Sequence, residues 1–395
     1  MTEQRPAGKL WRHPDLVIIY SITLIAVMGV ASITPAFPAV IGYFGIDPSE
    51  IAWLITVFTL PGIFLTPFLG LLADRIGRKK VLIPSLILFA IAGSACAFTT
   101  SYRTLLILRF FQGVGAASVG SLNLTLIGDL FSKPDRAAAM GYNASVLSLG
   151  TALYPALGGL LTLLGWNFPF LFPLLAIPVA FGVWYNLTEP DLEEAGSMTE
   201  QFKLVRKALL LPNVIWLFFL SLATFIILYG AVLTVFPVYL SERFQTSGVQ
   251  IGIIMSVMSV GTALASTRLG LLTRKFSSRL MILAGFAIYF LSILSFPLFR
   301  QYYFLFIPAL FYGLAQGINI PSIQTLLAGY SGTNTRATVM SVNGMVLRVG
   351  QTLGPLIAGW GMKLFSYPSL FTAFAIFSVA VWAGTILFFA RIKPA

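Results

Sequence analysis

The chain has 395 residues, of which 57% are hydrophobic and 10% are charged, and its mean hydropathy is +0.89. This composition lies far outside that of soluble domains and indicates a membrane protein. The formal net charge of +12 is interpreted as a topology signal and an attraction to anionic lipid, not as a nucleic-acid interface. One cysteine, Cys96, and one histidine, His13, exclude an internal disulfide and a cysteine or histidine metal cluster. No metal or cofactor is expected.

Apolar runs long enough to cross a bilayer, which takes about 20 helical residues, recur along the whole chain. Their continuity predicts α-helices, because barrel strands would alternate in polarity. The polar first residues and the length of the first run argue against a cleavable signal. The twelve predicted spans lie within 16–41, 50–72, 80–99, 102–129, 137–163, 167–187, 212–239, 248–272, 279–298, 302–327, 337–362 and 367–390.

Lysine and arginine are distributed unequally between the two sets of loops. If the N-terminus is cytoplasmic, the outer loops hold only Arg103, Arg243, Arg300 and Lys363, whereas the inner loops hold basic clusters such as 75–80 and 203–207. The positive-inside bias therefore predicts that both termini are cytoplasmic.

The two halves of the chain repeat each other. A polar stretch at 188–210 separates the sixth and seventh runs and is predicted to be a cytoplasmic linker between bundles at 1–187 and 211–395. DRAAAMG, starting at Asp135, aligns with TRATVMS, starting at Thr335, at a shift of two hundred that also pairs Pro155 with Pro355. Two parallel repeats with a site between them at mid-depth are typical of the largest secondary-transporter fold.

GLLADRIGRKK, residues 70–80, gathers one acid and four bases between two apolar runs. This segment resembles the loop 2–3 signature of the major facilitator superfamily. The resemblance implies a cytoplasmic latch in which Asp74 stabilises the outward-facing state near the start of the eleventh span, at Thr338. Asp129 is the predicted partner of Arg78. The predicted latch residues are Gly70, Asp74, Arg75, Gly77, Arg78, Asp129 and Arg136.

Two further segments resemble the drug:proton antiporter branch of that superfamily. RFFQGVGAA, residues 109–117, is similar to its R-x-x-Q-G signature in the fourth span, and the glycines of the fifth span keep the spacing of its antiporter signature. Tyr154 departs from that signature, which usually has a glycine there. The resemblance implies an all-α fold of twelve spans in two pseudo-symmetric six-helix bundles. The predicted hinge and packing residues are Gly141, Gly150, Tyr154, Pro155, Gly158, Gly159, Gly350, Gly354 and Pro355.

Two arginines are predicted deep in the membrane, where each costs about 2.5 to 3.5 kcal/mol on insertion scales. Arg109 lies in the fourth span and Arg348 in the eleventh, whereas no acid falls at mid-depth. The substrate cavity is therefore expected to be apolar, aromatic and slightly positive, although interhelical hydrogen bonds explain each polar residue equally well. The cavity candidates are Arg109, Gln112, Asn123, Tyr229, Met255, Met258, Gln316, Asn319, Asn343, Arg348 and Gln351.

Proton coupling by the usual route needs a carboxylate that gains and loses a proton. The candidates are Asp129, Glu50 and Glu242, for each of which a structural role is the alternative.

These features favour a monomeric exporter in a bacterial-type inner membrane that moves amphipathic organic compounds by rocker-switch alternation, with protons as the counter-ion. The alternative is an exporter or facilitator of an anionic metabolite, such as a siderophore, an organic acid or a lysolipid, with Arg109 and Arg348 as counter-ions. A receptor or scaffold on the same fold needs neither the latch nor the paired glycines. An enzyme is not expected, because the sequence carries no nucleotide loop or nucleophile constellation.

Overall fold

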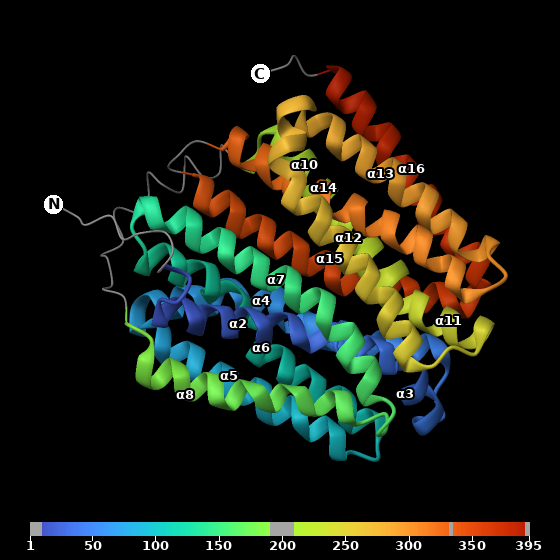
Figure 1. Cartoon of the computed structure of the whole chain (residues 1–395), viewed down its shortest axis with the longest axis horizontal. Coiled ribbons are helices and arrows are strands. Elements are labelled where there is room, and N and C mark those ends of the chain that lie inside the picture. The colour runs from blue at the N-terminus through green and yellow to red at the C-terminus, as the bar shows by residue number, and fades with distance from the viewer. Residues whose placement is uncertain (1–9, 190–208, 332–334, 392–395) are drawn as a thin grey trace. The chain divides into compact units, whose positions relative to one another are not determined.

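The computed structural model describes residues 10–189, 209–331 and 335–391, so most of the predicted 188–210 linker lies outside the described residues. The described chain is helical, and within each half the helices run alongside one another (Figure 1). The first half contains α2 (Pro14–Ala31), η1 (Thr34–Ala36), α3 (Phe37–Phe44), η2 (Pro48–Ile51), α4 (Ala52–Ile76), α5 (Arg78–Ala95), η3 (Cys96–Phe98), α6 (Tyr102–Leu130), α7 (Lys133–Leu161), η4 (Phe168–Leu175) and α8 (Ala176–Asn186). The second half contains α10 (Pro212–Ile227), η5 (Leu228–Val235), α11 (Phe236–Phe244), α12 (Gly248–Lys275), α13 (Ser278–Ser295), η6 (Phe296–Leu298), η7 (Tyr302–Leu305), α14 (Phe306–Tyr330), α15 (Arg336–Leu364) and α16 (Tyr367–Arg391).

Contacts within the chain define two compact units. Unit 1 comprises Met1–Phe44 and Val57–Glu194, and unit 2 comprises Gly45–Thr56 and Ala195–Ala395. The second predicted span is thus shared, because η2 and the first turn of α4 pack with unit 2. The domain limits at 187 and 211 remain a prediction.

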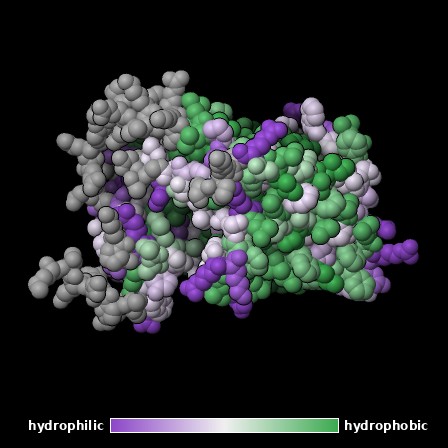
Figure 2. Space-filling view, turned by 90° about the horizontal axis from the view of Figure 1, so that it is seen from above, coloured by the Kyte–Doolittle hydropathy of each residue, from purple (hydrophilic) through white to green (hydrophobic). Residues whose placement is uncertain are grey.

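Eleven helical stretches among the described residues are long and apolar enough to cross a bilayer. The other predicted span is α15, a continuous helix of 29 residues whose apolar run is interrupted by Asn343, Arg348 and Gln351. Figure 2 shows broad areas of hydrophobic side chains on the viewed surface. Large apolar side chains such as Phe64 and Trp360 are 70% and 74% exposed, as expected of side chains that face lipid. The chain is a multi-pass membrane protein.

Close helix crossings in unit 1 occur at glycines. A Cβ atom on Gly113 would lie 2.1 Å from the carbonyl oxygen of Phe58, and one on Gly158 would lie 1.8 Å from that of Ser32. No larger residue fits without moving a backbone, so α6 and α7 approach their neighbours as closely as two helices can. Pro155, one turn before Gly158, is also buried.

A π-helical segment, η5, joins α10 to α11 in unit 2. Its wide turn is visible in the hydrogen bond from the Thr234 hydroxyl to the carbonyl oxygen of Tyr229, five residues earlier, at 2.7 Å. Gly354 of α15 fits against this turn, since its Cβ would lie 2.9 Å from Gly230 N and 3.1 Å from Tyr229 Cβ. The sequence gives no signal for this segment, and such insertions often mark functional sites.

Candidate functional site

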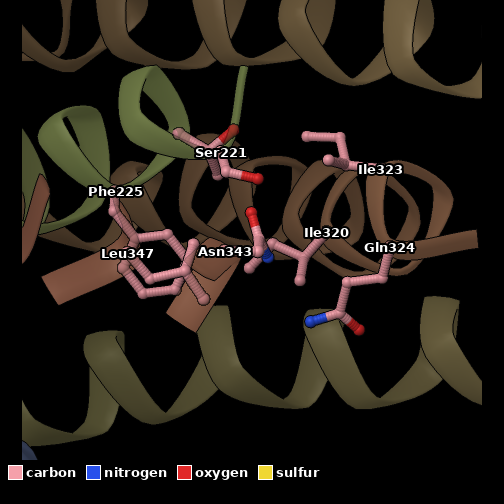
Figure 3. Close-up of a pocket in the computed structure, with 8 residues that line it drawn as sticks. Ser221, Phe225, Ile320, Ile323, Gln324, Asn343 and Leu347 are labelled. Carbon is pink, nitrogen blue, oxygen red and sulfur yellow. The ribbon is translucent and has the colours of Figure 1, made fainter. Parts of the chain in front are cut away.

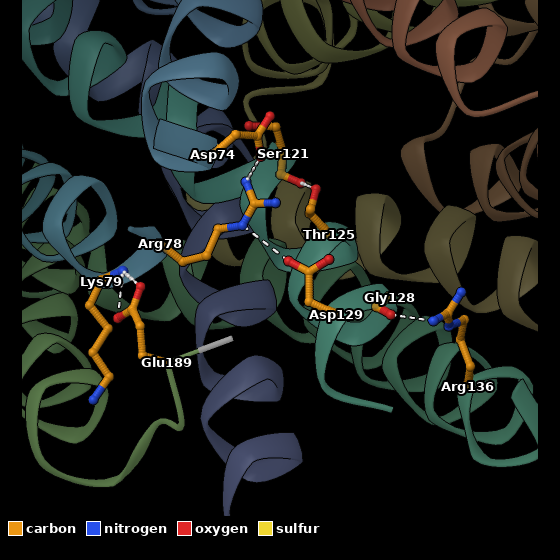
Figure 4. Close-up of polar contacts among 9 residues, drawn as sticks. All are labelled: Asp74, Arg78, Lys79, Ser121, Thr125, Gly128, Asp129, Arg136 and Glu189. Atoms are coloured by element: carbon orange, nitrogen blue, oxygen red, sulfur yellow. Dashed lines mark hydrogen bonds and ion pairs between the residues drawn. The ribbon is translucent and has the colours of Figure 1, made fainter. Parts of the chain in front are cut away.

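The latch segment is a helix break at Gly77, between α4 and α5. Gly77 has φ of 108°, a conformation that other residues rarely adopt. Arg78, which opens α5, is buried at 8% exposure, and its Nε donates to Asp129 Oδ2 at 3.0 Å. Its Nη1 also forms an ion pair with Asp74 (Figure 4). The structure thus joins the ends of α4, α5 and α6 through one arginine, whereas Gly70 has open space around it and Arg75 is exposed.

Glu189, which the sequence-based prediction missed, contacts the same segment. Its carboxylate accepts from the Lys79 backbone N–H at 3.3 Å, in the first turn of α5 (Figure 4). A Cβ on Gly77 would lie 2.8 Å from Glu189 Oε1, so this position needs glycine for a second reason. A carboxylate at a helix N-terminus is favourable. The neighbouring Thr188 backbone N–H donates to Asp15 Oδ1 at 2.7 Å. The acidic residues that directly follow the sixth predicted span were the sequence feature that could have indicated this contact.

Arg136 and Arg336 have matching roles in the two units. Arg136 donates to the carbonyl oxygens of Phe131, at 3.2 Å, and of Gly128 at the end of α6 (Figure 4). Arg336 donates to the Ala328 carbonyl oxygen of α14 at 3.1 Å. Each arginine therefore satisfies carbonyls that a helix end leaves without a partner. The repeat seen in the sequence corresponds to a repeated helix cap.

Arg109 lies inside unit 1 and is 0% exposed. Its Nη1 donates to the Gly29 carbonyl oxygen of α2 at 3.0 Å and to Gln112 Oε1 at 2.6 Å. Its guanidinium carbon lies 4.2 Å from the centroid of the Phe58 ring of α4, a cation–π arrangement. Arg109 and Gln112 therefore link three helices in this structure.

Arg348 lies in unit 2 and is partly exposed. Its Nη1 donates to Gln351 Oε1 at 3.3 Å, and it interacts electrostatically with the Tyr229 hydroxyl of η5. Tyr229 stacks on Phe225 with ring centroids 6.0 Å apart. The π-helical turn therefore brings an aromatic pair to the cationic residue of α15.

Matching polar triads occur in the two units. In unit 1 the Asn123 amide donates to the Thr23 hydroxyl, which also hydrogen-bonds Asn143 Oδ1. In unit 2 Asn319 Nδ2 donates to Thr224 Oγ1 at 3.0 Å. Asn343, at the position that repeats Asn143, is 2% exposed, and its Oδ1 has no hydrogen-bond partner. The first triad is closed and the second is open.

A small cavity lies beside the open triad. Figure 3 shows it between α10, α14 and α15, with the side-chain oxygen of Asn343 pointing toward Ser221. The cavity combines polar groups with apolar and aromatic walls, as ligand sites do. It is lined by Ser221, Thr224, Phe225, Ile320, Ile323, Gln324, Asn343 and Leu347.

The remaining cavity candidates are packed side chains. Met255 and Met258 are 3% and 5% exposed, and Gln316 accepts a hydrogen bond from the Tyr289 hydroxyl. Met258 also contributes the carbonyl oxygen that Gly313 packs against. These residues hold unit 2 together in this structure.

Of the proton-carrier candidates, Asp129 pairs with Arg78. Glu242 is exposed at the end of α11 and hydrogen-bonds Tyr367, and Glu50 is partly buried in η2. Among the described residues, no three His, Cys, Asp or Glu side chains gather where they could hold a metal ion.

The hinge and packing candidates are buried with one exception, Gly141. Gly150, Gly158, Gly350 and Gly354 each lie against a neighbouring helix, within 2.9 Å of a Cβ position. Tyr154, Pro155, Gly159 and Pro355 are also buried, and Gly141 has open space around it.

Two units of long apolar helices that carry arginine and amide side chains in their spans define a membrane transporter. A family model described as Major Facilitator Superfamily matches residues 19–247 and 230–395. The chain belongs to this superfamily. This match confirms the predicted family and the all-α fold of two six-helix repeats.

The relatives of the chain include named exporters. It is 25% identical over 358 residues to the bacillibactin exporter of Bacillus subtilis (strain 168), covering 86% of this chain and 88% of that protein. It is 24% identical over 374 residues to multidrug resistance protein 2 of the same organism, covering 91% and 92%. These relatives support a transporter of the drug:proton antiporter type.

Solved structures share the fold. A bacterial homolog of the human lysosomal transporter Spinster, in an inward-facing and occupied conformation, matches with a TM-score of 0.79 at 18% identity. The match covers 98% of this chain and 99% of that one.

Proposed function

We propose that this transporter exports amphipathic organic compounds across a bacterial inner membrane, with both termini cytoplasmic, and works as a monomer. The single observation that carries the proposal is the match, over about nine-tenths of both chains, to proteins named as exporters. The partly exposed Arg348 beside the Phe225–Tyr229 stack supplies an amphipathic surface of the kind such compounds need. Anionic lipids interact with the basic loops at the cytoplasmic face.

Alternation proceeds by rocking of two stiff bundles about the substrate. The close crossings at Gly158 in unit 1 and Gly354 in unit 2 support this proposal, because helices in backbone contact move as one body. The Asp74–Arg78–Asp129 cluster serves as the latch at the cytoplasmic end. Protons are the counter-ion, and Asp129 is the first carrier to test.

The test is transport in proteoliposomes under an imposed pH gradient, with matched cationic and anionic substrates. Efflux driven by the gradient and lost in Asp129→Asn supports proton antiport through that carboxylate. Asp135→Asn is the control, because Asp135 lies in the first turn of the next helix, α7. Transport of no substrate in the panel contradicts the exporter assignment.

A second candidate function is the export of an anionic metabolite. The observation that favours it is Arg348, a cation in a membrane-spanning helix that donates to the neutral Gln351 side chain. The similarity to a protein named as a bacillibactin exporter adds to it. Loss of anion transport in Arg348→Ala, with retention in Arg348→Lys, supports this candidate. Equal transport of cations and anions by Arg348→Ala contradicts it.

A further inference from the structure

The open triad of unit 2 is a place where the fold leaves a polar group without a partner. Asn343 Oδ1 is an acceptor on a side chain that is 2% exposed, and it lines the cavity between α10, α14 and α15. An unsatisfied buried polar atom costs about 1 to 3 kcal/mol. The repeated position in unit 1 avoids this penalty, because Thr23 hydrogen-bonds Asn143.

The equivalent threonine of unit 2 does not fill the same role. The Thr224 hydroxyl donates to the Leu220 carbonyl oxygen at 2.8 Å and accepts from Asn319 Nδ2 at 3.0 Å. Thr23 makes the same bond to the Ile19 carbonyl oxygen, at 2.9 Å, but also lies within hydrogen-bond distance of Asn143. Asn343 Oδ1 instead has no such neighbour among the described residues and faces the cavity together with Ser221 (Figure 3). Asn343 Oδ1 is thus an acceptor without a donor in the part of the chain that the structure describes.

The walls of the cavity indicate what carries that donor. Phe225 lines the cavity on one side and stacks on Tyr229 on the other, and Tyr229 interacts with Arg348. An aromatic surface thus runs from the acceptor oxygen to the cation, all within unit 2. The space between these side chains is that of about one water-sized group and is far smaller than a complete drug-sized site, so it accommodates a single polar group of a ligand.

We propose that the Asn343 cavity is a substrate subsite that accepts a hydrogen bond from a hydroxyl or amide N–H group of an aromatic anion. The negative charge of that ligand is held by Arg348, and its ring lies along Phe225 and Tyr229. This inference rests on the second candidate function, anion export, and names the substrate class as hydroxylated aromatic carboxylates and their relatives.

The experiment compares two probes, 6-hydroxy-2-naphthoate and 6-methoxy-2-naphthoate. Only the hydroxy probe can donate a hydrogen bond at the 6-position. Binding to the purified full-length protein in detergent is followed by calorimetry, so it does not depend on transport. The wild type is expected to bind the hydroxy probe about tenfold more tightly, the value of one well-made hydrogen bond. Asn343→Leu is expected to abolish that preference while leaving the affinity for the methoxy probe unchanged.

The repeat offers a matched fold control. Asn343→Leu removes an atom that has no partner, so the melting temperature is expected to stay level or rise. Asn143→Leu breaks the closed triad and is expected to lower the melting temperature. Arg348→Leu is expected to weaken both probes equally, because both carry the carboxylate.

Three outcomes overturn the inference: a hydroxy preference that survives Asn343→Leu, equal affinities in the wild type, or binding of neither probe. Counterflow of the hydroxy probe in proteoliposomes tests the proposed function separately. Binding with an Asn343-dependent preference but no transport upholds the subsite and contradicts anion export. Transport of both probes at wild-type rates by Asn343→Leu, with an unchanged preference, contradicts the subsite alone.

Discussion

Each unit carries an arginine and, three residues later, a glutamine on a membrane-spanning helix, and the two pairs differ in their surroundings. Arg109 and Gln112 are enclosed by α2 and α4, with a backbone carbonyl and the Phe58 ring against the guanidinium. Arg348 and Gln351 are partly exposed beside Tyr229. The same spacing of arginine and glutamine thus yields a structural bridge in one unit and an accessible cation in the other, so depth in the membrane alone does not assign a role.

The largest expected effect comes from exchanging the two arginines for leucine. Arg109→Leu leaves the Gly29 carbonyl oxygen and Gln112 Oε1 without this donor in a packed interior, so we expect a loss of about 3 kcal/mol. Arg348→Leu is expected to change stability by less than about 1 kcal/mol but to weaken anion binding. Melting temperature and ligand affinity are measured for both. An Arg109→Leu variant that keeps native stability but no longer binds the anion would contradict these assignments. Arg348→Lys is the control, because it keeps the positive charge.

The second largest effect on stability is expected where glycines allow two helices to cross closely. Gly158→Ala places a methyl group 1.8 Å from the Ser32 carbonyl oxygen in unit 1, whereas Gly354→Ala places one 2.8 Å from that of Ile226 in unit 2. We expect about 2 to 3 kcal/mol of destabilisation for the first and about 1 to 2 for the second. Gly141→Ala is the control, because open space surrounds Gly141 and alanine favours a helix. Thermal unfolding checks the order, and equal effects at Gly158 and Gly141 would contradict it.

A third comparison concerns the helix ends beside the latch. At a shift of 201, Arg78 and Asp129 of unit 1 correspond to Arg279 and Tyr330 of unit 2, where Arg279 donates to the Tyr330 hydroxyl at 3.1 Å. We expect Asp129→Asn to cost about 1 to 2 kcal/mol and Tyr330→Phe about 0.5 to 1.

The two substitutions are expected to differ in their response to salt. Added salt screens the Arg78–Asp129 ion pair and should narrow the difference between the wild type and Asp129→Asn. The Arg279–Tyr330 pair of unit 2, in which only the arginine is charged, should respond much less to salt. Unfolding is measured at about 0.05 M and about 0.5 M salt, where the Debye lengths are about 14 Å and about 4 Å. The comparison separates the salt response of Asp129→Asn from that of Tyr330→Phe. A salt-independent Asp129→Asn effect would show that charge is not what Asp129 contributes.

Much of the fold was predictable, because membrane-spanning length, charge bias and a two-hundred-residue repeat are properties of the sequence itself. The latch segment was also readable, since Asp74, Gly77 and Arg78 lie in one short motif. Packing was not. Burial of Arg109 depends on Gly29 and Phe58, which approach from other helices. Glu189 acts from more than a hundred residues away, and η5 has no periodicity that distinguishes it from an α-helix.

Asn343 shows the limit most clearly, because its sequence context repeats that of Asn143. In both units a threonine hydroxyl on another helix hydrogen-bonds the backbone carbonyl four residues earlier, but only in unit 1 does that hydroxyl also lie within hydrogen-bond distance of this asparagine. A pattern along one chain does not encode that choice, because the donor direction depends on how α10 and α15 cross at η5. The residue type was predictable and its unpaired state was not.

The smallest expected effect on stability is that of a substitution at the start of η2, which lies in the first half of the sequence but packs with unit 2. Asp47 caps η2 by accepting from the Ser49 backbone N–H at 2.9 Å. Hydrogen bonds from Ser49, and more weakly the charge of Lys363, hold the pKa of this carboxyl below its usual range. A lowered pKa stabilises the fold above the unfolded value of about 3.9 and loses that contribution as the pH falls through the folded value.

Asp47→Ala is therefore expected to lower stability by about 0.5 to 1 kcal/mol at neutral pH, the loss of a cap. Asp47→Asn keeps an acceptor for Ser49 but loses the charge that strengthens those hydrogen bonds and attracts Lys363, so its effect is expected to be smaller. Melting temperatures measured from pH 7 down to about pH 2, below the usual aspartate range, should converge for the wild type and Asp47→Asn at the acid end. A difference that persists in acid would mean that the carboxylate charge does not carry the effect, and that Asp47 contributes through its shape alone.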